Sequence, residues 1–195
     1  MTTPHECLGS WESAGTDPAA GHPFDPAALR WQLAPGARVL DLGGGRRTAE
    51  LTALGYAVEG VDRPGLPLPF GDGRFDAALL FGVLTRVAHD TGQRALLGEL
   101  ARVVRPGGLL HLSDVPLQTD PRSRARYAAY EDEFGAYGVF RTEDGAVVRH
   151  HEPEQLRRLL RMHGFAVTEE RTDTVGALHG HSVRRLQLIA RRAPA

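Results

Sequence analysis

Three consecutive glycines flanked by two aspartates form the first group of residues in this sequence that could bind a ligand. Gly43, Gly44 and Gly45 let the backbone turn tightly and expose amide groups at the start of a helix, where the helix dipole favours an anion. Asp41 lies before them, and Asp62 closes the next expected strand. A carboxylate there can accept both hydroxyls of a ribose. The pattern predicts a nucleotide-like ligand; the alternative is a structural turn whose aspartates only cap loops.

Histidine is the second candidate chemistry, because its pKa suits general acid–base catalysis near neutral pH. The chain has nine histidines. Those near the ends of expected parallel strands, or in the loops around them, should share the ligand face: His89, His150, His151, His179 and His181. We predict that His151 or His89 is the general base and that Asp114, at the end of a strand, completes the catalytic set. For each of these histidines, a polar loop residue is the competing interpretation. His111, inside a strand, and His163, at the far end of a helix, should be structural.

Two other patterns leave alternatives open. His179-Gly180-His181, with His150-His151, could hold a divalent ion, but no carboxylate-rich spacing completes such a site, and we predict no metal. Tyr127, Tyr130 and Tyr137 either line an aromatic pocket or, for the first two, pack in the core. These tyrosines fall in the segment Gln118–Arg149, which we expect to act as a lid over the ligand.

Size and composition limit the possible classes of protein. A chain of 195 residues that is 42% hydrophobic fits one domain with a sizeable core. The net charge of −1 gives no field to attract nucleic acid. Cys7 is the only cysteine, which fits a reducing cytoplasm, and no apolar run is long enough to span a membrane. We expect a soluble, cytoplasmic protein whose partner is a small molecule, with a homodimer left open.

Strands and helices alternate along most of the chain, which predicts an α/β fold. Expected strands cover Arg38–Leu42, Ala57–Val61, Ala77–Phe81, Leu109–Ser113, Phe165–Glu170 and Arg184–Ala190. Expected helices cover Asp25–Leu33, Arg47–Leu54, Gln93–Val104, Pro121–Phe134 and Pro153–Met162, with a hairpin over Val139–Val148. The prediction is a Rossmann-like, mostly parallel sheet with helices on both faces and an antiparallel last strand. Residues 1–23 should form a mobile or capping arm, and residues 24–195 one domain with the lid inserted at about 118–149.

Several motifs, in order, resemble the class I S-adenosylmethionine-dependent methyltransferases, especially small bacterial enzymes acting on metabolites. They are VLDLGGG (39–45), VEGVD (58–62), LPFGDGRFDAALL (68–80) and ELARVVRPGGLLHLSD (99–114). The resemblance implies S-adenosylmethionine as the cofactor and methyl transfer to a small molecule, with specialised metabolism as one setting. It implies that Asp41 and the glycine backbone hold the methionine moiety and that Asp62 holds the ribose. Arg63 and Phe81, which follow or end two of these strands, join the predicted cofactor set.

The sequence departs from the family's usual pattern in two places. Arg46 and Arg47 stand where the family has a further glycine, and RPGLPL (63–68) replaces a helix and a strand that usually carry an acid for the adenine. We therefore expect an abbreviated sheet edge after the second strand and a more open adenine side. These departures keep other functions in view: a methyltransferase-fold cyclase or rearrangement enzyme, or a non-catalytic partner subunit.

Overall fold

The computed structural model describes residues 22–43, 46–62, 65–176 and 182–194. Its strands are β1 (Arg38–Leu42), β2 (Ala57–Val61), β3 (Phe75–Phe81), β4 (Val104–Asp114), β5 (Val139–Arg141), β6 (Val147–Arg149), β7 (Phe165–Gly176) and β8 (Ser182–Arg192). Its helices are α1 (Pro26–Leu29), α2 (Arg46–Ala53), α3 (Val83–Arg86), α4 (Asp90–Val103), α5 (Pro121–Phe134) and α6 (Pro153–Met162). In the described part of the chain, every helix is too short or too polar to cross a membrane.

One six-stranded sheet organises the molecule, in the order β2-β1-β3-β4-β8-β7. Strands β2, β1, β3 and β4 are parallel, and β8 pairs antiparallel with both β4 and β7. The pairing places Asp41 opposite Leu79 and Phe81 opposite Ser113. The carboxyl ends of β1 to β4 therefore meet at one edge of the sheet, which we call the ligand edge. The predicted α/β class and the antiparallel last strand are confirmed.

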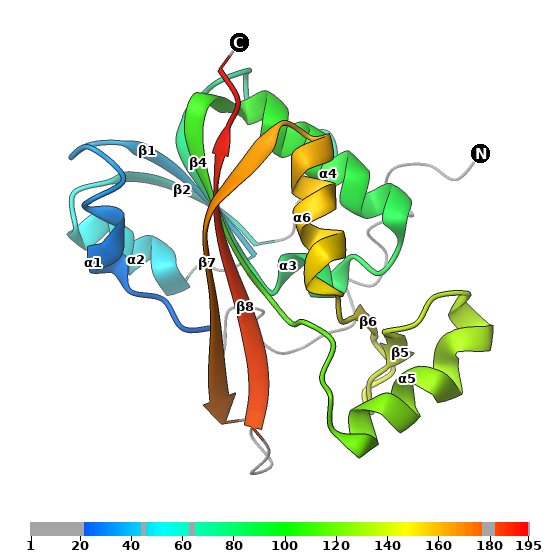
Figure 1. Ribbon diagram of the computed structural model, residues 1–195. Helices are drawn as coiled ribbons and strands as arrows, with labels where there is room; N and C mark the ends of the chain where they lie inside the picture. The colour runs from blue at the N-terminus through cyan, green and yellow to red at the C-terminus, as the bar shows by residue number, and fades with distance from the viewer. Residues whose placement is uncertain (1–21, 44–45, 63–64, 177–181, 195) are drawn as a thin grey trace.

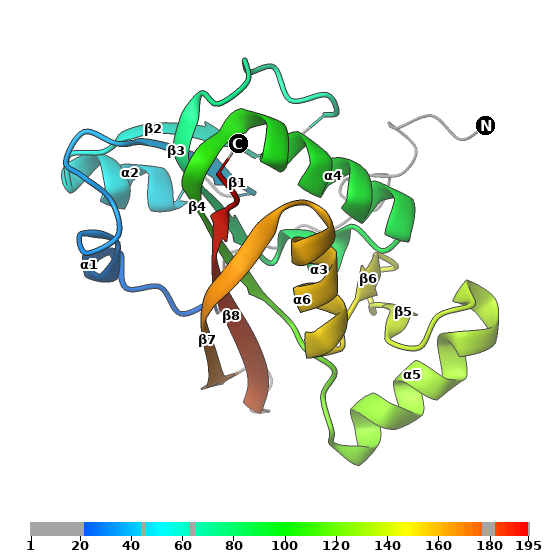
Figure 2. The same cartoon turned by 45° about the horizontal axis from the view of Figure 1, so that its top comes forward.

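Helices cover both faces of this sheet (Figure 1). On one face α1 and α2 bury Leu29 and Leu51 against Val39, Leu79 and Leu109. On the other, α3, α4 and α6 form the larger core with β1, β3, β4 and β8. Figure 2, seen after a 45° rotation, shows α4 and α6 stacked over that second face with the sheet behind them. Buried apolar side chains on both faces of the central strands explain why β1 and β3 are almost continuously hydrophobic.

The sheet is abbreviated after β2, as the sequence predicts. β2 is an edge strand, and residues 65–74, the described part of the connection to β3, contain no helix or strand. Side chains of α4 fix this loop instead: the Leu68 N–H donates to the Glu99 carboxylate at 2.7 Å, and Arg102 donates to the carbonyls of Phe70 and Leu68 at 2.6 and 3.0 Å. An arginine–glutamate pair therefore takes over the anchoring that a further strand would give.

Residues between β4 and α6, which we call the insertion, form α5 and the hairpin β5–β6. Helix α5 begins at the Asp120 cap, whose carboxylate accepts from the Ser123 N–H at 2.9 Å, and ends at Gly135 with φ 63°. The hairpin β5–β6 packs Phe140 and Val148 against Tyr127. In both views α5, β5 and β6 project beside the sheet (Figures 1 and 2). The predicted bounds of α5 and α6 are confirmed, and the hairpin lies where expected. The role of this insertion as a lid stays a prediction, as does the division at residue 23.

Several predicted boundaries are wrong. The first helix stops at Leu29, four residues short, and β4 begins at Val104, five residues before the predicted Leu109. Helix α4 starts three residues early, at Asp90, and α3 was not predicted. β7 and β8 each run beyond their predicted bounds because they pair with each other as far as Gly176 and Ser182. Cross-strand pairing extends strands through polar stretches that local pattern alone does not mark.

Candidate functional site

The cofactor side of the ligand edge is formed by the ends of β1 and β2. Asp41 is 1% exposed, and its Oδ2 accepts from the Thr48 hydroxyl at 3.1 Å, which ties the end of β1 to α2. Gly43 has φ 85° and donates its N–H to the Val61 carbonyl at 2.8 Å. Only glycine adopts that backbone conformation readily, which explains its place in the motif. Asp62 follows β2 and is exposed. The predicted residues Gly44, Gly45 and Arg63 lie outside the described residues.

Phe81, at the end of β3, lies under an arginine and a short N-terminal segment. The Arg47 guanidinium stands 4.1 Å from the Phe81 ring centroid and 5.3 Å from that of Phe24, and its Nη2 donates to the His22 carbonyl at 2.8 Å. His22 Nδ1 lies 2.8 Å from the Ser113 hydroxyl at the end of β4. We call residues His22–Phe24 the strap; Figure 1 shows them in dark blue, entering beside β7 and leading to α1. Sequence reasoning assigned His22 to the terminal arm and missed it.

Behind the strap, His111 belongs to a polar relay on the same face of the sheet. Its Nε2 lies 3.0 Å from Gln187 Oε1, and Gln187 Nε2 donates to Asp173 at 2.5 Å. Because the Gln187 oxygen must accept, His111 carries its proton on Nε2, and its buried Nδ1 has no hydrogen-bond partner among the described residues. Burial lowers the pKa of His111 to about 4. His111 is neutral and its Nδ1 is an acceptor beside a hollow of about 410 Å³ lined also by Asp25 and Ile189.

Asp114 and His151, two of the predicted catalytic residues, come together at the end of β4. His151 Nδ1 lies 3.9 Å from Asp114 Oδ1, and both side chains are fully buried. Asp114 accepts from the N–H groups of Thr85 and Val115 at 3.2 and 2.8 Å, yet burial raises its pKa to about 6. The His151 Nε2 lies 2.7 Å from the amide nitrogen of Gln93 and accepts from it, so the ring proton sits on Nδ1, facing Asp114. Burial lowers the pKa of His151 well below its usual value.

The two ends of the insertion are joined beside this pair. The His151 N–H donates to the Val115 carbonyl at 3.0 Å, and the His151 carbonyl accepts from the Leu117 N–H at 2.8 Å. Within the insertion, the Tyr127 hydroxyl lies 2.6 Å from His150 Nδ1 and accepts from the Gln118 N–H at 3.1 Å. Tyr127 is thus a buried packing residue, one of its two predicted alternatives. The main chain of His151 therefore joins the two ends of the insertion. To act as a general base, its buried side chain would first have to become accessible, which requires these contacts to break.

The remaining predicted residues are separate from this group. His89 is exposed at the start of α4. Tyr137 is 40% exposed and stacks edge-on to Tyr127 at 5.3 Å. The His163 Nδ1–H donates to the carbonyl of Leu159 in the preceding helix α6 at 2.9 Å, as a structural residue would. His179 and His181 lie outside the described residues, and no cluster of three potential metal ligands occurs in the part of the chain that is described.

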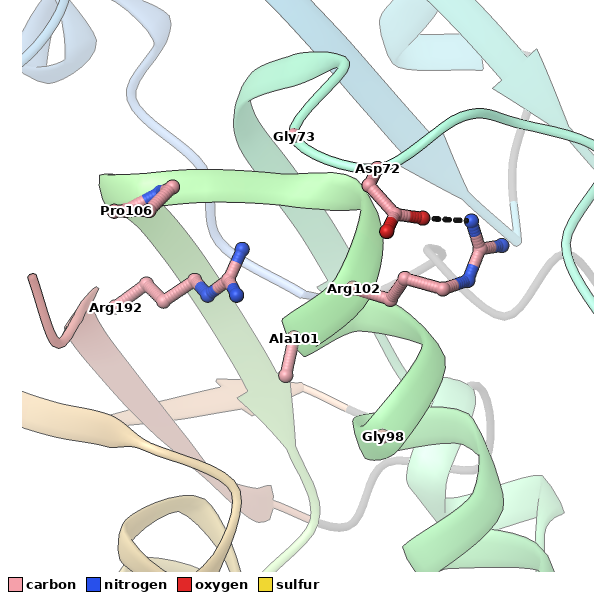
Figure 3. Close-up of a pocket in the computed structure, with 7 residues that line it drawn as sticks. All are labelled: Asp72, Gly73, Gly98, Ala101, Arg102, Pro106 and Arg192. Atoms are coloured by element: carbon pink, nitrogen blue, oxygen red, sulfur yellow. Dashed lines mark hydrogen bonds and ion pairs between the residues drawn. The ribbon is translucent and has the colours of Figure 1, made fainter. Parts of the chain in front are cut away.

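Another hollow lies at the opposite end of the sheet, near the amino ends of β3 and β4. It measures about 560 Å³ and is lined by the end of α4 together with Asp72, Pro106 and Arg192 (Figure 3). The two arginine side chains that line it bind other groups of the protein: Arg102 pairs with Asp72 at 2.9 Å, and Arg192 donates to the Val104 carbonyl. Ligands of parallel sheets bind at the carboxyl ends of strands, so this hollow is not the candidate site.

The sheet is mostly parallel, and its strand β8, next to the edge strand β7, runs antiparallel to its neighbours. A buried acid and a positive-φ glycine lie at the end of β1, and a second acid follows β2. Together these features define a class I methyltransferase-like protein. Residues 18–170 match the family model described as a methyltransferase domain. The chain belongs to this family. It is a methyltransferase that uses S-adenosylmethionine.

A curated relative supports the same assignment. The chain is 31% identical over 173 residues to the demethylmenaquinone methyltransferase of Thermus thermophilus, covering 80% of this chain and 76% of the relative. The enzyme of the same name from Mycobacterium tuberculosis is 35% identical over 124 residues, and the match spans 53% of this chain and 51% of that one. The chain therefore spans about half the length of the mycobacterial relatives.

Two solved structures share the fold. A S-adenosylmethionine-dependent methyltransferase from Methanosarcina mazei superposes with a TM-score of 0.78 at 22% identity, over 88% of this chain and 99% of that one. The 1,6-didemethyltoxoflavin N1-methyltransferase of Burkholderia thailandensis, solved with its substrate and S-adenosylhomocysteine, gives 0.70 at 21% identity, over 99% and 92%. At these identities the likeness extends to the fold.

The described residues fit the cofactor. The buried Asp41 carboxylate, which accepts from the Thr48 hydroxyl, is the kind of acceptor with which an ammonium group pairs. Asp62, exposed at the end of the neighbouring strand, has the chemistry to accept hydroxyl donors. Gly43, with φ 85°, lets the backbone turn directly after β1. The adenine side depends in part on residues 63–64, which are outside the described range.

Proposed function

We propose that this methyltransferase acts on a small-molecule acceptor bound at the ligand edge, beside β3 and β4, and that it works in the cytoplasm. The observation that carries the proposal is the pair of acids at the ends of β1 and β2, with Asp41 buried and Asp62 exposed around a glycine turn. This arrangement leaves the ends of β3 and β4, with their aromatic and histidine side chains, for a second ligand.

The names of relatives support a small acceptor. The Thermus thermophilus relative is named for demethylmenaquinone and the Burkholderia thailandensis structure for 1,6-didemethyltoxoflavin, both small molecules. In this chain the ring cluster of Phe24, Phe81 and His111, with centroids 5.0 to 5.9 Å apart, offers aromatic faces at the same edge. We infer a ring-containing acceptor, which such faces contact favourably. Specialised metabolism is the setting we propose for it.

The chain's own residues supply binding, orientation and exclusion of water. When bound, S-adenosylmethionine supplies a methyl group activated by its sulfonium, and the transfer is an in-line displacement that depends on alignment. Asp41 and Asp62 hold the cofactor side; the strap and the insertion between β4 and α6 cover the acceptor side. Where the acceptor must lose a proton, we keep His151, His89 and Asp114 as the proposed catalytic residues. Of these, His89 is the one already exposed to solvent.

Titration calorimetry with S-adenosylmethionine and S-adenosylhomocysteine tests the proposal first, using Asp62→Ala as the matched variant. Binding by the wild type that weakens in the variant is expected. A second assay incubates the enzyme with methyl-labelled cofactor and a panel of small hydroxylated or aminated ring compounds, and measures release of S-adenosylhomocysteine. The absence of cofactor binding would refute the methyltransferase site. Binding without release for any small acceptor would instead favour a cyclase or a partner subunit.

A further inference from the structure

The strap crosses the ligand edge on side-chain contacts rather than as part of a helix or strand. Residues 22–25 have no regular secondary structure. The contacts that attach the strap include those of the His22 ring to the Ser113 hydroxyl at 2.8 Å, the His22 carbonyl to Arg47 at 2.8 Å, and the Phe24 ring to Phe81 at 5.3 Å. His22 is 7% exposed. A segment attached in this way can detach without breaking any sheet or helix hydrogen bond.

Arg47 connects the strap to the glycine turn. It lies in the first turn of α2, directly after residues 43–45, and it is 7% exposed. Its guanidinium stacks on both Phe24 and Phe81 while donating to the His22 carbonyl. Arginine suits this task because its planar group can stack and donate at once, which the lysine ammonium cannot. Arg47, one of the two arginines that depart from the glycine pattern, thus has a structural use.

The strap also borders the space that a second ligand would need. Ser113 and Phe81 end β4 and β3, next to Asp114. Phe24 contacts the His111 ring at 5.9 Å, and Asp25, the next residue, lines the hollow beside His111 together with Gln187. With the strap in place, His111 Nδ1 is buried and has no partner among the described residues. Displacing Phe24 would join this hollow to the ligand edge.

We propose that residues His22–Phe24 form a gate over the ligand edge and that Arg47 is its latch, a positioning residue that acts through the strap. The strap opens to admit a ligand and closes over it. The inference rests on the proposed function, because it assumes that ligands bind at this edge. A latched gate slows both entry and exit, so loosening the latch should raise both rates.

The test follows S-adenosylhomocysteine, a non-reacting probe, by surface plasmon resonance on the full chain. We expect Arg47→Ala to raise its association and dissociation rate constants about tenfold, corresponding to about 1.4 kcal/mol of latch energy. Phe24→Leu keeps apolar bulk but removes the aromatic face, and should act similarly. The double variant should add little, because both changes release one latch. Arg47→Lys should not restore the wild-type rates.

Arg74→Ala is the matched control, since Arg74 also stands near two phenylalanine rings, at 5.9 and 5.8 Å, away from the strap. Its rates should equal those of the wild type. Amide exchange over residues 22–25 in the ligand-free chain gives a second readout and should quicken in Arg47→Ala and in Phe24→Leu but not in Arg74→Ala. Unchanged exchange and rate constants in folded Arg47→Ala and Phe24→Leu would overturn the gate. If the wild type itself fails to bind the probe, the proposed function falls, while the exchange measurement still decides whether Arg47 latches the strap.

Discussion

Acidification from pH 7 to pH 5 should destabilise this protein strongly, because it buries neutral histidines. Burial, with nearby arginines, lowers the pKa of His22 to about 3, and burial lowers that of His111 to about 4. Burial lowers the pKa of His151 well below its usual value, and that of His150 to about 3. In the unfolded chain these rings titrate near 6.5. Below that pH the unfolded state binds more protons than the folded state, so stability falls as the pH falls.

The magnitude follows from the two protonation states. Between pH 7 and pH 5, one histidine that stays neutral when folded and titrates at 6.5 when unfolded costs about 2 kcal/mol of folding stability. His22, His111 and His151, all at most 7% exposed, together cost about 6 kcal/mol. Asp114 opposes them: its folded pKa of about 6 lies above its unfolded value, so protonation on acidification returns about 1 kcal/mol. The net loss of about 5 kcal/mol is comparable with the whole stability of a domain.

Urea unfolding followed by circular dichroism at pH 7, 6 and 5 measures this loss. His151→Gln is the informative variant, because a glutamine oxygen can still accept from the Gln93 amide and cannot titrate. It should reduce the loss between pH 7 and pH 5 by about 2 kcal/mol, whatever its effect at pH 7. A wild-type stability that is level from pH 7 to pH 5, or an identical slope in His151→Gln, would refute the reasoning.

Three further substitutions test the cofactor edge, the insertion and the sheet. Asp62→Ala should weaken S-adenosylmethionine binding by about 1 to 3 kcal/mol, measured by calorimetry, because a charged acceptor is lost; unchanged affinity would show that Asp62 does not hold the ribose. Tyr127→Phe should lower stability in urea by about 1 to 2 kcal/mol, since His150 Nδ1 and the Gln118 N–H lose their shared partner. Gly108→Ala should destabilise by more than about 2 kcal/mol, because its Cβ would lie 2.6 Å from Val104 Cγ1 and 2.8 Å from the Arg105 carbonyl; Gly71→Ala, with nothing within 4 Å, is the neutral control.

The sequence pattern alone predicts the elements whose ends or burial are set by neighbouring residues. Pro121 with the Asp120 cap and Gly135 set both ends of α5, and apolar runs marked the parallel strands buried on both faces. The motif acids Asp41, Asp62 and Asp114 all lie at strand ends on one edge, as predicted. The full lengths of β7 and β8 were not predicted, because residues such as Val175 and Val183 extend the two strands only by pairing with each other.

The site residues that sequence reasoning misjudged are those whose role depends on distant partners. His111 was assigned to the strand interior, where it indeed lies, but its relay needs Gln187 and Asp173 from the last two strands. His151 reached the expected edge, yet its ring is fixed by Gln93 and faces Asp114. None of these partner residues lies at a fixed sequence spacing from its histidine, so the sequence alone does not reveal them. Tertiary contacts, rather than residue type, decide which imidazole nitrogen carries the proton.

The two departures from the family pattern have one physical feature in common: near each of them an arginine donates to main-chain carbonyls of an irregular segment. Beyond β2, Arg102 and Glu99 hold the loop of residues 65–74 by its carbonyls and an N–H, and so close the core that a further strand and helix would cover. After the glycine turn, Arg47 holds the strap over Phe81. Main-chain carbonyls of irregular segments need donors, and an arginine supplies several from one side chain. A shortened sheet edge and an altered glycine turn are therefore compatible with an ordered ligand edge, and they do not by themselves argue for loss of the cofactor site.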